Sequence, residues 1–151
     1  AGKVFAYPGR AFGEEQPKYI TIVLDQNQKK ILGLDRVDDN RNIIIVEGPI
    51  DSLFLPNCIA VAQGDLRLPQ YKEKSTLVFD NEPRNREIVK NIEKAIEEDY
   101  SVVIWPQDIE EKDINDMVIS GLTTSEISNI IHRNTFSGLQ AKTQISYWKK
   151  V

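Results

Sequence analysis

Acidic side chains follow two short apolar runs of the sequence. Glu47 comes directly after the run 43–46, and Asp80 comes directly after the run 76–79. The acidic residues of the two clusters are Glu47, Asp51, Asp80 and Glu82. Each run predicts a strand, and in an open parallel α/β sheet ligands bind beyond the carboxyl ends of the strands. Because hard divalent cations prefer carboxylate oxygens, the two clusters predict a cation site at this edge of a sheet.

Several residues of this predicted site have more than one interpretation. Gly48 suits a turn that leaves a strand, because glycine readily adopts positive φ and permits a close backbone approach. Asp51 could bind metal indirectly or cap a following helix, since aspartate is favoured at helix N-termini. Asp113 could complete the cation site or lie in a solvated acidic loop. We favour the cation site for Asp113 and leave both interpretations of Asp51 open.

Three segments in this order resemble the TOPRIM domain of bacterial-type primases, topoisomerases and some nucleases. Residues 47–51 read Glu-Gly-Pro-Ile-Asp, which is similar to the primase form of the family's Glu-Gly loop. Residues 80–82 read Asp-Asn-Glu where the family usually has Asp-x-Asp, so Glu82 retains the charge and reaches one methylene further. Residues 112–116 read Lys-Asp-Ile-Asn-Asp and are similar to the Lys-Asp segment of primases. The order and spacing of all three are more specific than any one of them.

The resemblance implies roles for individual residues and a cofactor, Mg²⁺, for which Mn²⁺ could substitute. The implied catalytic residues are Glu47, Asp80 and Glu82. The implied metal ligands are Glu47, Asp80, Glu82, Asp51, Asp113 and Asp116. The implied contacts to nucleotides or nucleic acid are Arg10, Lys18 and Lys112. Glu47 could serve instead as a general acid or base, and Arg10 and Lys18 could instead be exposed charges of a hairpin.

The residues before the first acidic cluster extend the resemblance toward primases. Gly-Arg at 9–10, Pro-Lys-Tyr-Ile at 17–20 and Leu-Gly-Leu at 32–34 resemble the end of the primase amino-terminal catalytic subdomain. Residues 53–57 and the arrangement as a whole are most similar to primases of T4-like bacteriophages. The resemblance therefore implies that residues 1–40 end that subdomain, as a β-rich lead-in, and that residues 41–151 form a TOPRIM domain with carboxy-terminal helices.

For such a core the resemblance implies DNA primase activity, the synthesis of short RNA primers on single-stranded DNA by metal-dependent nucleotidyl transfer. The implied partners are the single-stranded template, ribonucleoside triphosphates and a hexameric replicative helicase. Two alternatives stay open. The same carboxylates could serve a TOPRIM metal-dependent nuclease, or the chain could be a non-catalytic module that binds nucleic acid or protein.

Apolar runs alternate with helical patterns along most of the chain. The expected strands are 43–46, 59–62, 76–79 and 101–104. The expected helices are 84–98, 125–132 behind a capping box of Thr123 and Glu126, and 138–150. Alternation of this kind predicts an α/β fold with a mostly parallel sheet flanked by helices, of the TOPRIM or Rossmann-like type. Before it, 19–24 and 30–34 predict the two strands of a small β-hairpin.

Composition limits the remaining possibilities. The chain has 151 residues, of which 40% are hydrophobic, which suits one ordinary globular domain. Its net charge of −4 argues against a generic basic nucleic-acid binder. No apolar run approaches the ~20 residues that cross a bilayer, so we expect no membrane partner and a cytoplasmic protein, in the host cytoplasm if a phage encodes it. Trp105 and Trp148 are expected in a core or interface rather than stacked on bases.

Overall fold

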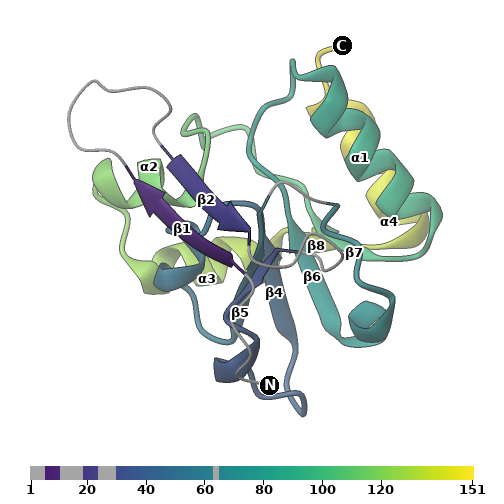
Figure 1. The fold of residues 1–151 in the computed structure, drawn as a ribbon. Coiled ribbons are helices and arrows are strands. Elements are labelled where there is room, and N and C mark those ends of the chain that lie inside the picture. Colours follow the sequence, from purple (N-terminus) through teal and green to yellow (C-terminus); the bar gives the residue numbers. More distant parts are fainter. Residues whose placement is uncertain (1–5, 11–18, 24–29, 63–64) are drawn as a thin grey trace.

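The computed structural model describes residues 6–10, 19–23, 30–62 and 65–151, with the first two ranges limited to the backbone. Most described strands form one sheet of six strands (Figure 1). These strands are β3 (Ile31–Leu32), β4 (Ile43–Val46), β5 (Cys58–Val61), β6 (Ser75–Val78), β7 (Ser101–Val103) and β8 (Thr135–Phe136). Their order across the sheet is β3-β5-β4-β6-β7-β8. The predicted α/β fold is confirmed.

The centre of the sheet is parallel and its two edges are antiparallel. Parallel pairing joins β5 to β4, β4 to β6 and β6 to β7. At the two edges, β3 pairs antiparallel with β5 and β8 pairs antiparallel with β7. The four parallel strands are the four predicted apolar runs, each displaced by one residue at most. Such runs form central strands because both of their faces are buried. The parallel centre brings the carboxyl ends of β4 and β6 to one edge.

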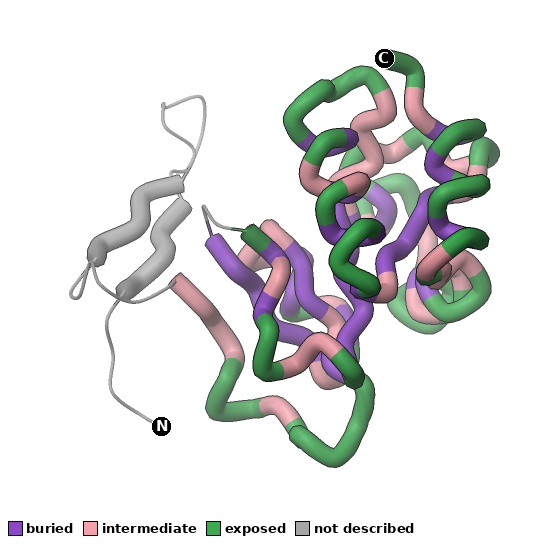
Figure 2. The backbone as a smooth tube through the Cα atoms, turned by 90° about the vertical axis from the view of Figure 1, so that its right-hand side faces the viewer, coloured by how far each residue is buried: buried purple, intermediate pink, exposed green. Residues whose placement is uncertain are grey.

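Helices cover both faces of the sheet. They are α1 (Arg86–Glu97), α2 (Ile114–Ile119), α3 (Thr124–Arg133) and α4 (Gly138–Trp148). Figure 1 shows α1 and α4 side by side on one side of the sheet and α2 and α3 on the other. Along β6 and just beyond it, Leu77 and Phe79 pack with α1 and α4, while Val78 between them packs with α2 and α3. This alternation places a buried core on each side of the strands (Figure 2).

Local sequence signals set the helix boundaries. Asn85 caps α1, because its side-chain oxygen accepts hydrogen bonds from the backbone of Glu87 and Ile88. Thr123 and Glu126 form the predicted capping box at the start of α3. Short 3₁₀ turns complete the chain, namely η1 (Leu34–Arg36), η2 (Asp51–Phe54) and η3 (Pro69–Lys74). α2 is only six residues long and was not predicted from the sequence.

The amino-terminal hairpin differs from the predicted one. β1 (Ala6–Arg10) pairs antiparallel with β2 (Tyr19–Val23) in a separate two-stranded sheet. The prediction that 19–24 pairs with 30–34 is wrong, because β3 in the second of these segments pairs with β5 of the main sheet. Both segments are short apolar runs, and their composition does not distinguish a neighbouring partner from a distant one. The division at residue 40 stays a prediction.

Both tryptophans lie in the core, as predicted. Trp105 is 3% exposed and Trp148 is 7% exposed, so neither presents a ring for base stacking. Each indole N–H has a partner, because Trp105 Nε1 donates to the carbonyl oxygen of Phe79 at 2.9 Å and Trp148 Nε1 donates to Asn81 Oδ1 at 3.1 Å. In the described part of the chain, no helix has the length and apolar character needed to cross a bilayer.

Candidate metal centre

Glu47 lies directly beyond the carboxyl end of β4 and begins the first acidic segment. The residue that follows it has to be small. A Cβ built on Gly48 would lie 3.0 Å from Asp51 Cγ and would overlap the Asp51 carboxylate. Gly48 is not among the glycines with positive φ in the described residues. The turn therefore needs glycine for the close approach of the Asp51 side chain.

Asp51 connects the first acidic segment to the third. Its side chain is buried, and its Oδ1 accepts a hydrogen bond of 2.8 Å from the backbone N–H of Asn115 in the first turn of α2. Asp51 makes no side-chain capping bond to η2, the helical turn that starts at Asp51 itself. The interpretation as a cap of the following helix is therefore wrong. Asp51 instead holds the start of α2, 64 residues later in the chain.

The second acidic segment follows β6. Asp80 and Glu82 are half-buried, with Asn81 between them. The chain just before Asp80 is fixed by the bond from the Trp105 indole to the Phe79 carbonyl. Asn81 fixes the segment itself, because its backbone N–H donates to the carbonyl oxygen of Lys112 at 2.6 Å. The second acidic segment thus lies against the third.

The third acidic segment forms the amino-terminal end of α2. Asp113 is the N-cap residue of this helix, and its side chain accepts a 2.8 Å hydrogen bond from the backbone N–H of Asp116. Asp113 is half-buried, whereas Asp116 and Lys112 are exposed. From the sequence we favoured a cation site over a solvated loop for Asp113. Its observed position is a helix cap that borders the other acidic segments.

Burial among like charges raises the pKa of three carboxyl groups. Burial, then Glu47, Asp51 and Asp113, raises the pKa of Asp80 from 3.8 to about 7. Burial, and the charges of Asp113, Asp116 and Glu47, raise the pKa of Asp51 from 3.8 to about 6, against the opposing hydrogen bond from Asn115.

The pKa of Glu47 is raised by burial first and then by the charges of Glu82 and Glu87. Lys112 lowers the pKa of both Glu47 and Asp80, and its predicted contact to nucleotides or nucleic acid stays a prediction. Each of the six acidic residues that the sequence singled out as ligands therefore interacts electrostatically with at least one other member of the set. Buried anions of one sign are unfavourable unless a cation offsets them.

The donor set fits a hydrated magnesium ion. All of its side-chain donors are carboxylate oxygens, the ligand type that Mg²⁺ and Mn²⁺ favour. Among the described residues, no three carboxylate, imidazole or thiol side chains lie close enough together to hold a metal ion. Mg²⁺ typically takes only one or two protein carboxylates and completes its shell with waters and substrate phosphates. One or two of these carboxylates could hold such an ion, with waters and substrate phosphates as its other ligands.

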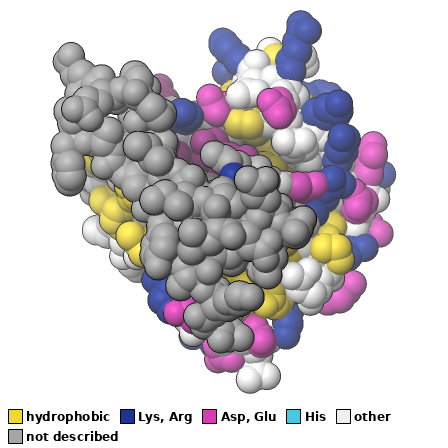
Figure 3. Space-filling model, viewed as in Figure 1, with side chains coloured by type: hydrophobic (Ala, Val, Ile, Leu, Met, Phe, Trp, Pro, Cys, Tyr) yellow, Lys and Arg dark blue, Asp and Glu magenta, His cyan; other side chains and the backbone are white. Residues whose placement is uncertain are grey.

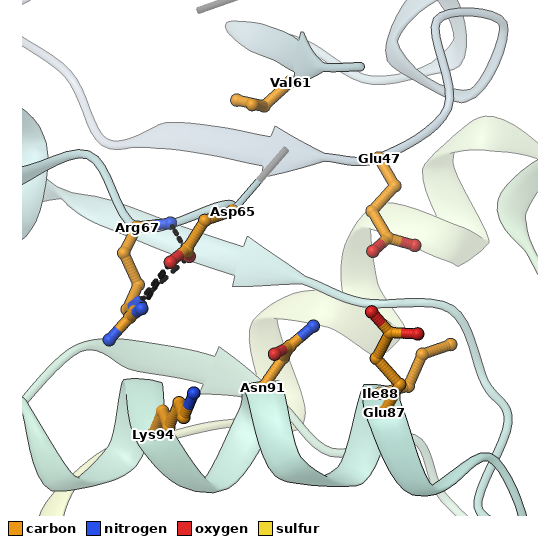
Figure 4. Close-up of a pocket in the computed structure, with 8 residues that line it drawn as sticks. All are labelled: Glu47, Val61, Asp65, Arg67, Glu87, Ile88, Asn91 and Lys94. Atoms are coloured by element: carbon orange, nitrogen blue, oxygen red, sulfur yellow. Dashed lines mark hydrogen bonds and ion pairs between the residues drawn. The ribbon is translucent and has the colours of Figure 1, made fainter. Parts of the chain in front are cut away.

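A pocket of about 600 Å³ opens beside Glu47, between the sheet edge and α1 (Figure 4). The Glu47 and Glu87 carboxylates face each other at one end, and Asp65 and Arg67 lie at the other. Glu87, on α1, is exposed and was not singled out in the sequence. It belongs to this pocket because the fold brings Glu47, from a distant part of the chain, to face it.

Two predicted nucleic-acid contacts lie where the structure describes no side chain. Arg10 is the last residue of β1, of which only the backbone is described, and Lys18 lies outside the described residues. Basic and acidic side chains alternate over the right-hand part of the face shown in Figure 3, where α1 lies. That part of the surface therefore carries no large field of one sign.

The fold and this edge define an α/β protein whose acidic side chains gather beyond the carboxyl ends of parallel strands. The chain is 37% identical over 155 residues to the DNA primase of Enterobacteria phage T4, an alignment that covers 99% of the chain and 45% of that protein. It is 26% identical over 123 residues to the DNA primase of Thermotoga maritima, covering 69% of the chain and 22% of that protein. No protein-family model matches the chain. The chain is thus homologous to DNA primases and spans less than half the length of either relative.

Proposed function

We propose that this chain forms the catalytic core of a DNA primase, which synthesises short RNA primers on single-stranded DNA with Mg²⁺. The observation that carries the proposal is the meeting of three acidic segments at the carboxyl edge of the sheet, in a chain homologous to primases. The order of these segments is that of a TOPRIM domain, and we assign residues 41–151 to that family.

Primer synthesis joins a 3′ hydroxyl to the α-phosphate of a ribonucleoside triphosphate and releases pyrophosphate. Mg²⁺ bound at this edge would activate the hydroxyl and offset the charge that develops on the phosphate oxygens. Glu47 and Asp80 are the first candidates to hold it. Glu47 directly follows β4, Asp80 follows β6 after the buried Phe79, and both carboxyl groups have a raised pKa. A bound cation would lower both pKa values and keep the carboxylates ionised.

The remaining acidic residues would support these two. Glu82 and Asp113 border Glu47 and Asp80 and can add oxygen ligands as substrate phosphates enter. Asp51 is already bonded to Asn115, so we assign it to orienting the third segment rather than to direct ligation. Lys112 is exposed beside the cluster, where its ammonium group can contact phosphate oxygens.

We extend the proposal to the partners that primer synthesis needs. These are a single-stranded DNA template, ribonucleoside triphosphates and a hexameric replicative helicase. Arg10, Lys18 and Lys112 are the proposed contacts to nucleotides or nascent primer, because guanidinium and ammonium groups suit phosphate oxygens.

One gel assay tests the proposal. The chain is incubated with labelled ribonucleotides and separately labelled single-stranded DNA, in Mg²⁺ and in Mn²⁺, beside Glu47→Gln. We expect short RNA products from the wild type that disappear in the variant. Cleavage of the DNA without ribonucleotide incorporation would replace the proposal with a metal-dependent nuclease. No product in either channel would indicate a binding module or a core that needs further domains for activity.

A further inference from the structure

Asn81 lies between Asp80 and Glu82, and its side chain forms its hydrogen bonds with other parts of the chain. Its Nδ2 donates to the carbonyl oxygens of Ile109 at 2.9 Å and Glu111 at 3.1 Å. Its Oδ1 accepts from the indole N–H of Trp148 at 3.1 Å. An amide side chain has two N–H donors and one carbonyl acceptor, so every polar atom of this side chain has a partner.

The partners of Asn81 belong to two distant parts of the chain. Residues 109–112 lead directly into Asp113 and α2, and the backbone N–H of Asn81 also bonds to this loop, at Lys112. Trp148 is the last residue of α4. Asn81 therefore joins the segment that carries Asp80 and Glu82 to the segment that carries Asp113, and it braces both against α4.

We infer that Asn81 is a positioning residue, which sets Asp80 and Glu82 against Asp113 and thereby determines how tightly this edge holds its metal ion. The inference rests on the proposed function, because it takes these acidic residues as the metal-binding set. Residues that orient metal ligands through hydrogen bonds typically change metal affinity 10- to 100-fold when they are replaced.

The amide cannot be exchanged for a carboxylate of the same shape. An aspartate at this position could not donate to the carbonyl oxygens of Ile109 and Glu111 and would turn a negative charge toward them. It would also add one more negative charge to an already acidic site. If the site simply accumulated negative charge, Asn81→Asp would bind a cation more tightly. The positioning role predicts weaker binding.

Asn57 provides a matched control at the opposite end of the sheet. Its Oδ1 accepts from the backbone N–H of Asp38 at 2.6 Å, and its Nδ2 donates to the carbonyl oxygens of Asp38 at 3.1 Å and Asn42 at 2.9 Å. Asn57 thus joins a loop to the start of β5 much as Asn81 joins a loop to the end of β6. Asn57→Ala removes a comparable set of bonds without touching the acidic segments, and it also strains the backbone because Asn57 has a φ of 48°.

The experiment is a Mn²⁺ titration of the full chain, followed by electron paramagnetic resonance of the free ion. Wild type, Asn81→Ala, Asn81→Asp and Asn57→Ala are compared, each checked for folding by circular dichroism. We expect both Asn81 variants to bind Mn²⁺ about ten-fold more weakly, and Asn57→Ala to bind within two-fold of wild type. If Asn81→Ala does not fold, the nearly isosteric Asn81→Asp decides the comparison.

Three results would overturn the inference. Wild-type affinity in a folded Asn81 variant would show that Asn81 does not position the ligands. An equal loss in Asn57→Ala would show that the effect is a general loss of the fold. Tighter binding by Asn81→Asp would show that charge alone governs affinity. Absence of Mn²⁺ binding by the wild type is a different result, because it removes the metal site of the proposed function and the inference with it.

Discussion

At both ends of the parallel strands an asparagine side chain ties a loop to the sheet, but the acidic side chains nearby differ in their exposure to solvent. At the amino end, Asn57 ties a loop to the sheet, and the nearby Asp38 and Asp39 are exposed to solvent. At the carboxyl end, Asn81 ties another loop, but the acids beside it are buried or half-buried. Exposed carboxylates need no partner, whereas buried ones with raised pKa values favour a bound cation. This difference in burial is why we propose the metal site at the carboxyl end.

Loss of a carboxylate should have the largest effect, and only at the carboxyl end. Asp80→Asn retains the shape of the side chain but removes its charge, so we expect primer synthesis to fall about 100-fold or more, since even outer residues of metal sites change activity 10- to 100-fold. Asp38→Asn at the amino end should stay within two-fold of wild type. Initial rates of ribonucleotide incorporation at saturating Mg²⁺ measure both. Equal losses in the two variants would remove the distinction between the ends.

A side chain at Gly48 should have the second largest effect. In Gly48→Ala the new methyl group meets the Asp51 carboxylate, so either the turn shifts or Asp51 leaves the N–H of Asn115. We expect a loss of about 1–3 kcal/mol in the free energy of unfolding together with weaker Mn²⁺ binding. Asn57→Ala should lose about the same stability through its hydrogen bonds and retain Mn²⁺ affinity. Urea unfolding and Mn²⁺ titration separate the two effects.

The third effect in size should be that of pH on the stability of the metal-free protein. The pKa of Asp80 is about 7 in the folded state, against the ordinary value of 3.8 that we take for the unfolded chain. This contribution to stability is fully present below the unfolded pKa and is lost as the pH rises through the folded pKa. We expect Asp80→Asn to gain on the order of 1–2 kcal/mol over wild type at pH 8 in EDTA, after allowance for solvent screening, and little at pH 4.

The matching variant at the other end, Asp38→Asn, should unfold like wild type at both pH values because Asp38 is exposed. Chemical unfolding at pH 4 and pH 8 checks both variants. Wild-type stability that rises between these pH values more than that of Asp80→Asn would contradict the burial of Asp80. Adding Mg²⁺ at pH 8 should stabilise the wild type and not Asp80→Asn, since a ligand stabilises only the state that binds it.

The smallest expected effect concerns Lys112, whose charge lowers the pKa of Glu47 and of Asp80. Because Lys112 is exposed, its removal should change these interactions by about 0.2–1 kcal/mol, less than one pKa unit. Lys112→Gln should therefore raise the pKa of Asp80 slightly, and Lys74→Gln at the amino end should leave it unchanged. Carboxyl-carbon NMR titration measures both. A lower Asp80 pKa in Lys112→Gln would contradict the placement of Lys112 beside the cluster.

Much of the sheet could be predicted because its signal is local. Apolar runs such as 43–46 and 76–79 are the strands, and the acidic residues directly after them reach the same edge because the strands are parallel. The hairpin could not be predicted in this way. β2 pairs with a strand that precedes it, and β3 pairs with β5 far along the chain, while their short runs carry no mark of either partner.

The acidic residues of the site could be predicted from the sequence, but the hydrogen bonds that hold their segments together could not. Glu47 and Asp80 follow apolar runs, which is a pattern in the sequence itself. Asn81 bonds to backbone carbonyls about 30 residues away, and a carbonyl has no signature in the sequence. Asp51 likewise finds the backbone of Asn115 rather than a side chain. Such bonds become visible only once the fold has brought the segments together.

The most direct test of this account is the position of a bound paramagnetic ion in the folded chain. Substoichiometric Mn²⁺ broadens the amide NMR signals of residues near the ion. We expect the signals of residues 47–51, 80–82 and 113–116 to broaden first, while those of residues 38–42 and Asn57 stay sharp. Broadening centred on the amino end, or spread evenly over all exposed acidic residues, would contradict a metal site at the carboxyl edge.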